Sequence, residues 1–245
     1  MPDLENMKVL VVGGGSGIGR AFAVAARAQG ASVFVADLHP GAEVDSVCDV
    51  SDDEQCRTLL AESTKALGGL DVLADSAGVA HFGPLEKLGP EAYAHTYLVH
   101  VIGMANLVRH AREHLSRSPS PSVVAVASAV AGRAYHGSAA YGTSKAALIH
   151  WSKVAANELA ADGVRVNCVC PGPIETPMLR NGAPSGMSDE KWLAQVGSST
   201  GLGRVGRVEE VAEAMVFLAS RRSSFITGAV INVDGGESVH DSIHH

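Results

Sequence analysis

Three side chains in the stretch VASAVAGRAYHGSAAYGTSKAAL have the chemistry for proton transfer. Tyr141 and Lys145 lie four residues apart in a segment with helical periodicity, so their side chains share one face. A tyrosine is a poor base alone, because its pKa is about 10, but a lysine ammonium one turn away stabilises the phenolate and lowers that pKa. Ser128 ends the preceding apolar run, and its hydroxyl can hold a substrate oxygen against the tyrosine. The group suits proton exchange with an alcohol or a carbonyl.

A second stretch, VLVVGGGSGIGRAF, is typical of a phosphate-binding turn. Gly13, Gly17 and Gly19 follow an apolar run and open a helical pattern. Glycines allow a tight turn and close approach of a ligand, and the helix N-terminus offers unpaired N–H groups. Because this turn lies between a predicted strand and a predicted helix, it indicates a dinucleotide site.

The choice of dinucleotide depends on the end of the next predicted strand. Asp37 lies there, and a carboxylate at that place accepts both ribose hydroxyls of an adenosine and repels a 2′-phosphate. Leu38 follows it, and neither Gly15 nor Ser16 is basic, so nothing in these segments neutralises such a phosphate. The sequence therefore favours NAD over NADP.

The rest of the chain predicts the strands and helices that hold these residues in position. Short apolar runs alternate with helical patterns, as in an α/β fold whose doubly wound parallel sheet of about seven strands has helices on both faces. We expect one domain over residues 1–245. The predicted strands are 9–12, 32–36, 47–48, 72–74, 123–127, 165–169 and 230–233, and the predicted helices are 17–29, 53–67, 91–115, 139–161 and 208–219.

The segment 171–205 differs from its surroundings. It is rich in Gly, Pro, Ser and Thr, with a few large apolar residues between them. A connection of that length inside a compact domain is usually functional, so we interpret it as a mobile lid over a substrate pocket. A merely flexible surface loop is the alternative.

Composition excludes several classes of function. The chain has 245 residues, a formal net charge of -7 and no basic run, so we expect neither nucleic acid nor a membrane as a partner. Its start carries acidic residues where a signal peptide is basic, and its apolar run is too short to cross a bilayer. The four cysteines fit a reducing compartment, without the spacing of a metal site. We expect a cytoplasmic protein without a metal.

Taken in order, the motifs resemble those of the short-chain dehydrogenase/reductase family in its compact, single-domain form. The resemblance spans essentially the whole chain, because CDV (48–50), DSAG (75–78), RVNCVCPGPIETPM (165–178) and GAVINVDGG (228–236) join the stretches above. It implies a Rossmann-like fold and an enzyme that interconverts a secondary alcohol and a ketone with NAD(H). It also implies a homotetramer or homodimer, packed through the predicted helices 91–115 and 139–161.

The resemblance gives each matching catalytic residue a role. Tyr141 matches the general acid/base, Lys145 the lysine that lowers its pKa and binds the nicotinamide ribose, and Ser128 the serine that positions the substrate oxygen. The serine loop is one residue longer than usual, so an alignment on Gly132 would put Ala129 in that position. The preceding strand and the usual separation from the tyrosine favour Ser128.

The resemblance also implies a larger set of residues that contact the cofactor. Asp49 and Val50 match the pair that borders the adenine, and the turn at 171–176 matches the one that holds the nicotinamide carboxamide. The residues expected at the cofactor are Gly13, Ser16, Gly17, Ile18, Gly19, Asp37, Leu38, Asp49, Val50, Ser76, Ala77, Gly78, Tyr141, Lys145, Pro171, Gly172, Ile174 and Thr176.

Three residues beside the cofactor site differ from the family pattern. Val12 stands where a threonine usually precedes the glycine turn, and Asp75 and Ser76 replace two asparagines. In the family the threonine hydroxyl ties the glycine turn to the asparagine loop. We expect the polar link to be altered, the cofactor site to be kept and its affinity to be lower.

A fourth departure lies within the predicted helix 91–115. Matching Tyr93 to the family's aromatic and Gly103 to its glycine puts His100 on the catalytic asparagine, which holds a water in the proton relay. An imidazole can also bridge a water and carries protons near neutral pH. One hypothesis is that His100 replaces the asparagine in the relay. The other is that it only fills the space and protons leave by another route.

The substrate pocket is expected to be largely apolar, lined by Tyr135, His136, Met178, Leu179, Met187 and Trp192. The short segment between Asp37 and Asp49, together with the serine and tyrosine stretch, is similar to dehydrogenases of cyclic dihydrodiols. A non-catalytic NAD-binding regulatory protein on the same fold is the alternative, motivated by the departures. The intact serine, tyrosine and lysine favour the enzyme.

Overall fold

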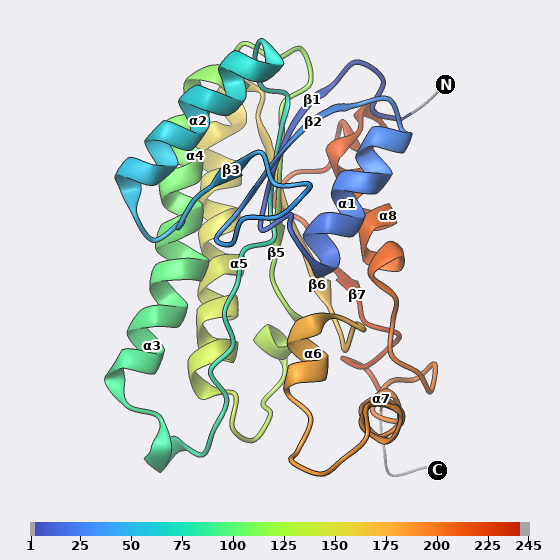
Figure 1. Ribbon diagram of the computed structural model, residues 1–245. Coiled ribbons are helices and arrows are strands. Elements are labelled where there is room, and N and C mark those ends of the chain that lie inside the picture. The colour runs from blue at the N-terminus through green and yellow to red at the C-terminus, as the bar shows by residue number, and fades with distance from the viewer. Residues whose placement is uncertain (1–2, 241–245) are drawn as a thin grey trace.

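A single sheet of seven parallel strands forms the centre of the molecule. The computed structural model describes residues 3–240 (Figure 1). The strand order is β3-β2-β1-β4-β5-β6-β7, which confirms the doubly wound α/β fold expected from the alternation of elements. The strands are β1 (Lys8–Val12), β2 (Ser32–Asp37), β3 (Ser46–Val47), β4 (Val72–Asp75), β5 (Ser122–Val126), β6 (Arg165–Pro171) and β7 (Val230–Val233).

Helices cover both faces of the sheet. Figure 1 shows α1 and α8 on one face and α2, α4 and α5 on the other. The helices are α1 (Gly17–Ala28), α2 (Asp53–Leu67), α3 (Pro90–Tyr97), α4 (Gly103–Leu115), α5 (Ala139–Leu159), α6 (Pro177–Asn181), α7 (Asp189–Gly197) and α8 (Val208–Ala219). Among residues 3–240, none of them has both the length and the apolar character that a bilayer crossing needs.

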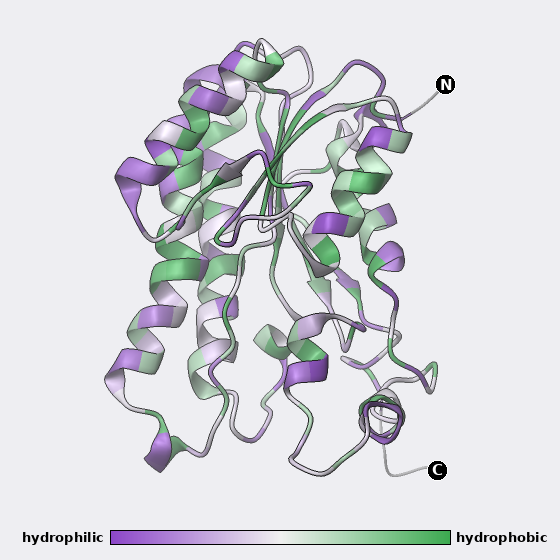
Figure 2. Cartoon of the chain, viewed as in Figure 1, coloured by the Kyte–Doolittle hydropathy of each residue, from purple (hydrophilic) through white to green (hydrophobic). Residues whose placement is uncertain are grey.

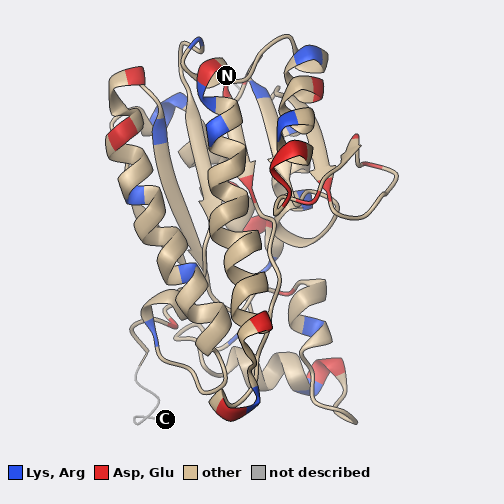
Figure 3. Cartoon of the chain, turned by 90° about the vertical axis from the view of Figure 1, so that its left-hand side faces the viewer, with Lys and Arg blue, Asp and Glu red and all other residues tan. Residues whose placement is uncertain are grey.

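Two apolar cores flank the sheet. Alternate residues of β1 point to opposite faces, so Leu10 and Val12 pack under α2, α4 and α5, whereas Val9 and Val11 pack under α1 and α8. All five residues of β5 are buried, as its continuous apolar run predicts. Figure 2 shows this pattern, with apolar colour along the strands and hydrophilic colour on the outer helix surfaces. In Figure 3, basic and acidic residues are interspersed over the helices.

The predicted helix 91–115 has a break in its hydrogen-bond pattern that the apolar spacing did not reveal. The chain runs through α3, a π-helical turn at Leu98–Ile102, and then α4. Wide turns of this kind are rare, and they are frequently found at functional sites. His100 is the central residue of the turn and is 1% exposed.

The segment 171–205, interpreted from its composition as a mobile lid, contains the short helices α6 and α7, which were not predicted. Thr176 caps α6 by accepting a hydrogen bond from the Leu179 N–H at 3.2 Å. The indole of Trp192 in α7 donates to the Leu179 carbonyl at 2.8 Å, and Arg180 forms ion pairs with acidic residues on both sides of it. Caps and side-chain contacts therefore hold these helices, which is why composition alone did not predict them.

Candidate active site

A cavity of about 820 Å³ opens at the carboxyl ends of the strands. Such a place is where open parallel sheets bind ligands. Every residue expected at the cofactor lines it except Gly19, and Ser128 lines it together with the expected pair Tyr141 and Lys145. His100 is not among the lining residues.

The glycine turn is shaped for close contact with both a ligand and the rest of the protein. Gly13 has a φ of +69°, and a Cβ there would lie 2.5 Å from the Ala77 nitrogen. A Cβ on Gly19 would lie 2.2 Å from the Gly13 oxygen, so the lack of a side chain at Gly19 lets the first turn of α1 pack directly against the glycine turn. Helix α1 begins at Gly17, after Ser16 at the N-cap position, without a side-chain cap or an acidic residue in its first turn. Its N-terminal N–H groups therefore suit an anion such as phosphate.

At the far end of the cavity, Asp37 lies beside the glycine turn. Its carboxylate accepts hydrogen bonds from the Gly15 N–H at 2.9 Å and the His39 N–H at 3.1 Å. Arg20 is the cation next to the turn, and it is paired with Glu43 at 3.3 Å. Among the described residues that line the cavity, Lys145 is the only lysine or arginine.

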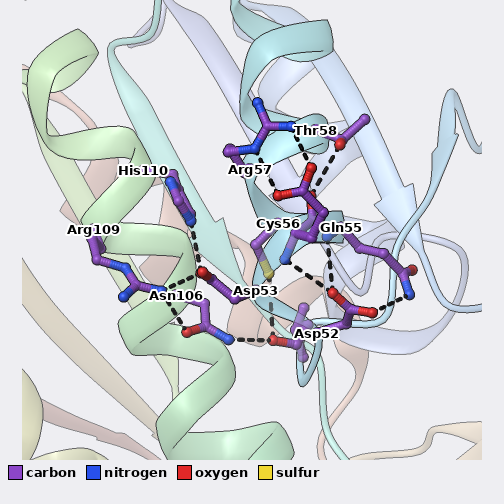
Figure 4. A network of polar contacts seen from close by, with 11 residues as sticks. Asp52, Asp53, Gln55, Cys56, Arg57, Thr58, Asn106, Arg109 and His110 are labelled. Carbon is purple, nitrogen blue, oxygen red and sulfur yellow. Dashed lines mark hydrogen bonds and ion pairs between the residues drawn. The ribbon is translucent and has the colours of Figure 1, made fainter.

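The segment that carries Val50 is held by two helices (Figure 4). The Val50 carbonyl accepts from the Asn106 side-chain amide of α4 at 3.1 Å and from the Cys56 thiol of α2 at 3.4 Å. In the same network Asp53 accepts from Arg109 and His110 of α4. The junction of α2 and α4 thus fixes the wall where an adenine is expected.

Ser128, Tyr141 and Lys145 come together at the middle of the cavity. Ser128 follows β5, and its hydroxyl oxygen accepts a hydrogen bond from the Val130 N–H at 3.3 Å, which leaves the hydroxyl proton to donate. The Lys145 ammonium donates to the Val126 carbonyl at 2.8 Å and lies 5.9 Å from the centre of the Tyr141 ring. Of the two serine-loop candidates, Ser128 lines the cavity and Ala129 does not.

Burial dominates the acidity of these groups. It raises the pKa of Tyr141, and the neighbouring Ser128 hydroxyl opposes that rise. It lowers the pKa of Lys145 to about 8, against the favourable charge of Asp75. The lysine was expected to bring the tyrosine pKa down. Desolvation of the phenolate is instead the largest influence on the Tyr141 pKa, and the group that opposes it is Ser128 rather than Lys145.

His100 lies behind the catalytic residues, and both of its ring nitrogens are engaged. The Val79 N–H donates to Nε2 at 3.0 Å, so the ring proton is on Nδ1, which donates to the Ser144 hydroxyl at 2.8 Å. That hydroxyl in turn donates to the Tyr141 carbonyl at 2.7 Å. Burial lowers the pKa of His100 to about 2, so the ring stays neutral. These contacts leave neither nitrogen for a relay water and favour the hypothesis that His100 fills the space.

The three departures near the glycine turn are joined by backbone contacts. Val12 lies opposite Asp75 in the sheet register, and the Ser76 N–H donates to the Val12 carbonyl at 2.9 Å. The Asp75 carboxylate accepts from the Ala77 N–H at 2.9 Å, within its own turn. Burial raises the pKa of Asp75 to about 6, although Lys145 and the Ala77 N–H oppose that rise.

The substrate end of the cavity was predicted in part. Tyr135, His136, Met178, Leu179 and Trp192 line it as expected, whereas Met187 does not. Sequence reasoning missed Phe82, whose ring centre is 5.1 Å from that of Tyr141, and the lining residues His95 and Glu237. Glu237 follows directly on the glycines after the last strand, and this position at the carboxyl end of the sheet was the available signal.

Comparisons with known proteins agree with this geometry. A family model described as enoyl-(acyl carrier protein) reductase matches residues 13–238. The chain is 34% identical to cis-4-hydroxycyclohexanecarboxylate dehydrogenase of Sinomonas cyclohexanicum, over 93% of this chain and 94% of the relative. It is 36% identical to 2,3-dihydro-2,3-dihydroxybenzoate dehydrogenase of Escherichia coli strain K12, over 97% and 99%. Ligand-free aldohexose dehydrogenase of Thermoplasma acidophilum has a similar structure, with a TM-score of 0.94, 33% identity and coverage of 100% and 98%.

Proposed function

The chain belongs to the short-chain dehydrogenase/reductase family of enzymes, and from this premise we propose that it interconverts a secondary alcohol and a ketone with NAD(H). The observation that carries the proposal is the meeting of Ser128, Tyr141 and Lys145 in the cavity that the glycine turn borders. A proton donor and acceptor, a positioning hydroxyl and a cation at one place are what a carbonyl–alcohol exchange needs.

The residues present suit the nicotinamide dinucleotide that the family binds. The uncapped N-terminus of α1 would hold the phosphates, Asp37 the adenosine ribose, and the turn around Pro171 the carboxamide. We propose NAD because Asp37 would repel a 2′-phosphate and Arg20 is already paired. When bound, the nicotinamide supplies the group that accepts or donates the hydride.

The chain's own residues would handle the proton. In the oxidative direction the Tyr141 oxygen takes the proton of the substrate hydroxyl while the Ser128 hydroxyl fixes the substrate oxygen. The Lys145 ammonium, held by the Val126 carbonyl, supports the negative charge that forms on Tyr141. In the reductive direction Tyr141 returns the proton to the carbonyl oxygen.

For the substrate we propose a secondary alcohol on a six-membered carbocycle. Two relatives, by name, act on a hydroxycyclohexane ring and a dihydroxylated dihydrobenzoate ring. The substrate end of the cavity has apolar walls that suit a carbocycle, including Phe82, Met178 and Trp192. Helices α6 and α7 form one side of this end, and we propose that they act as the lid.

We also propose a homo-oligomer in the cytoplasm. Exposed apolar residues on the π-helical turn and on α5, such as Leu98, Ile102 and Val154, mark a face suited to a second copy. The four cysteines are free thiols, which fits a reducing compartment.

The test is an assay with NAD⁺ and a panel of cyclic alcohols, with Tyr141→Phe beside the wild type. We expect turnover by the wild type and a loss of at least about a hundredfold in kcat for the variant, because the proton acceptor is gone. Thermal shift with NAD⁺ checks that the variant still binds the dinucleotide. Turnover that survives Tyr141→Phe, or NAD binding without turnover of any alcohol, would overturn the proposal.

A further inference from the structure

We propose that Glu237 determines substrate specificity by accepting a hydrogen bond from a second hydroxyl group of the substrate. This inference rests on the proposed function, since it concerns the substrate of the same cavity. The predicted preference is for a ring diol over the corresponding ring with a single hydroxyl.

The position of Glu237 is unusual for a carboxylate. It is 6% exposed and lines the cavity at the end that also holds Tyr135 and Trp192. The other acidic residues that line the cavity, Asp37 and Asp49, belong to the adenosine end. Glu237 is therefore the single carboxylate available to a substrate among the described lining residues.

The hydrogen bonds of Glu237 reach only one of its two oxygens. Oε1 accepts from the Tyr135 hydroxyl at 2.6 Å and from the Ser199 hydroxyl at 3.5 Å, and no hydrogen bond from residues 3–240 reaches Oε2. No lysine or arginine in that part of the chain forms an ion pair with the carboxylate. Arg133 lies nearby, but it bonds to the Glu237 backbone carbonyl and packs over the Tyr135 ring.

Oε2 is not among the buried side-chain atoms that lack a partner in residues 3–240, and Glu237 lines the cavity, so this oxygen can accept a hydrogen bond from a molecule bound there. A hydroxyl on the substrate ring supplies the donor without bringing a second charge. An ammonium group would fit less well, because the Arg133 guanidinium lies beside the same residue and would repel it. A site that pairs a buried polar group with a substrate hydroxyl also discriminates strongly against the analogue that lacks it.

The experiment compares cyclohexane-1,2-diol with cyclohexanol as substrates of the full chain. The measured quantity is the ratio of kcat/KM for the diol to kcat/KM for cyclohexanol. We expect a ratio well above one for the wild type. In Glu237→Gln it should fall by about tenfold or more, because a charged acceptor is replaced by an amide.

Tyr135→Phe is the matched control, since it breaks the same contact but keeps the carboxylate. We expect its ratio to stay at or above that of the wild type. A collapse of the ratio in Tyr135→Phe equal to that in Glu237→Gln would mean that the contact only holds the loop, and it would overturn the inference. A wild-type preference for 2-aminocyclohexanol over the diol would overturn it as well.

Calorimetric titration of both ring compounds into the wild type and Glu237→Gln, each with NADH present, measures the same preference without turnover. A diol preference in binding that disappears in Glu237→Gln supports the inference even if neither compound is oxidised, an outcome that would count against the proposed function alone. Equal affinities for the two compounds in both proteins overturn the inference.

Discussion

At the scale of single residues, Asp75 is the departure with the largest predicted effect. Its carboxyl is buried, and its pKa is raised to about 6 by desolvation. A folded-state pKa above the unfolded value means that the native protein holds the proton more tightly. The contribution of this group to stability is therefore fully present below about pH 4 and is lost as the pH rises through 6.

Replacing Asp75 by asparagine should stabilise the protein at alkaline pH. The amide oxygen can still accept from the Ala77 N–H, but no charge is buried. We expect the free energy of unfolding to rise by about 2–3 kcal/mol near pH ~8, since each pKa unit is worth about 1.4 kcal/mol and the raised pKa of Asp75 already includes the attraction to Lys145.

Urea denaturation at about pH 8 and about pH 4 measures this effect, and the gain should shrink to less than about 1 kcal/mol at the lower value. A gain of the same size at both would show that charge burial is not its cause.

Asp37 is the residue on which the choice of dinucleotide depends. Asp37→Ser removes the negative charge that would repel a 2′-phosphate, while the serine hydroxyl can still reach a ribose hydroxyl. The ratio of kcat/KM with NAD⁺ to kcat/KM with NADP⁺ should fall by about tenfold or more in this variant. Steady-state assays with both dinucleotides measure the ratio, and a wild type that prefers NADP⁺ would contradict the assignment.

At the scale of elements, the π-helical turn explains why His100 could be placed but not interpreted from the sequence. The match to the family pattern placed His100 at the active site. The π-helical turn, however, determines that its ring points toward Val79 and Ser144. Nothing in the apolar spacing of residues 91–115 marks a change from one hydrogen-bond register to the next. A π-helical turn shifts the side chains that follow it by about one position, and so small a shift cannot be read from the apolar spacing of one sequence.

His100→Ala should lower stability without changing how activity depends on pH. The variant leaves a cavity and an unpaired Val79 N–H, so we expect it to lose about 2–4 kcal/mol of unfolding free energy. Its kcat/KM should fall while the apparent pKa values of its pH–rate profile stay where they are, because the imidazole of the wild type is already neutral.

His100→Asn is the matched variant for this prediction, since it restores the residue that the family usually has and keeps a polar side chain. The pH–rate profiles of the wild type and both variants should have one shape. An inflection present in the wild type and missing from both variants would return His100 to the proton path.

Other elements differ in how far the sequence predicted them, for physical reasons. Strands such as β5 were predicted because burial on both faces demands a continuous apolar run. Helices α6 and α7 were missed because they depend on caps and on the contact between Trp192 and Leu179. Ser128, Tyr141 and Lys145 were placed by motif spacing, whereas Glu237 reaches the cavity only through the fold.

At the scale of the whole molecule, the outer face of the π-helical turn and of α5 carries exposed apolar residues, and we propose that it packs against a second copy of the chain. Leu98 and Ile102 are 43% and 46% exposed, and Val154 of α5 is 44% exposed. Exposed apolar residues grouped on neighbouring helices are typical of subunit interfaces. These helices were also the ones expected to pack in an oligomer.

A charge on this face should dissociate the oligomer. Ile102→Glu places a carboxylate where a second copy would bury it, so we expect the sedimenting mass to fall to half or less of the wild-type value. Val24→Glu is the matched control, because Val24 is similarly exposed on α1, at the opposite face of the sheet. A wild type that sediments as a monomer, or equal dissociation by both variants, would contradict the prediction.

The contact between the glycine turn and the loop after β4 has a mechanical consequence. A Cβ on Gly13 would lie 2.5 Å from the Ala77 nitrogen, so the two loops touch along their backbones and neither shifts without the other. Gly78 follows, and a Cβ there would lie 3.3 Å from the ring of His100 and 3.7 Å from the Lys145 ammonium. A displacement at the phosphate end is thus passed directly to the proton-transfer end. We expect the floor of the cavity to move as one body, and we propose that the freedom that ligands need to enter and leave lies at its rim, in α6 and α7.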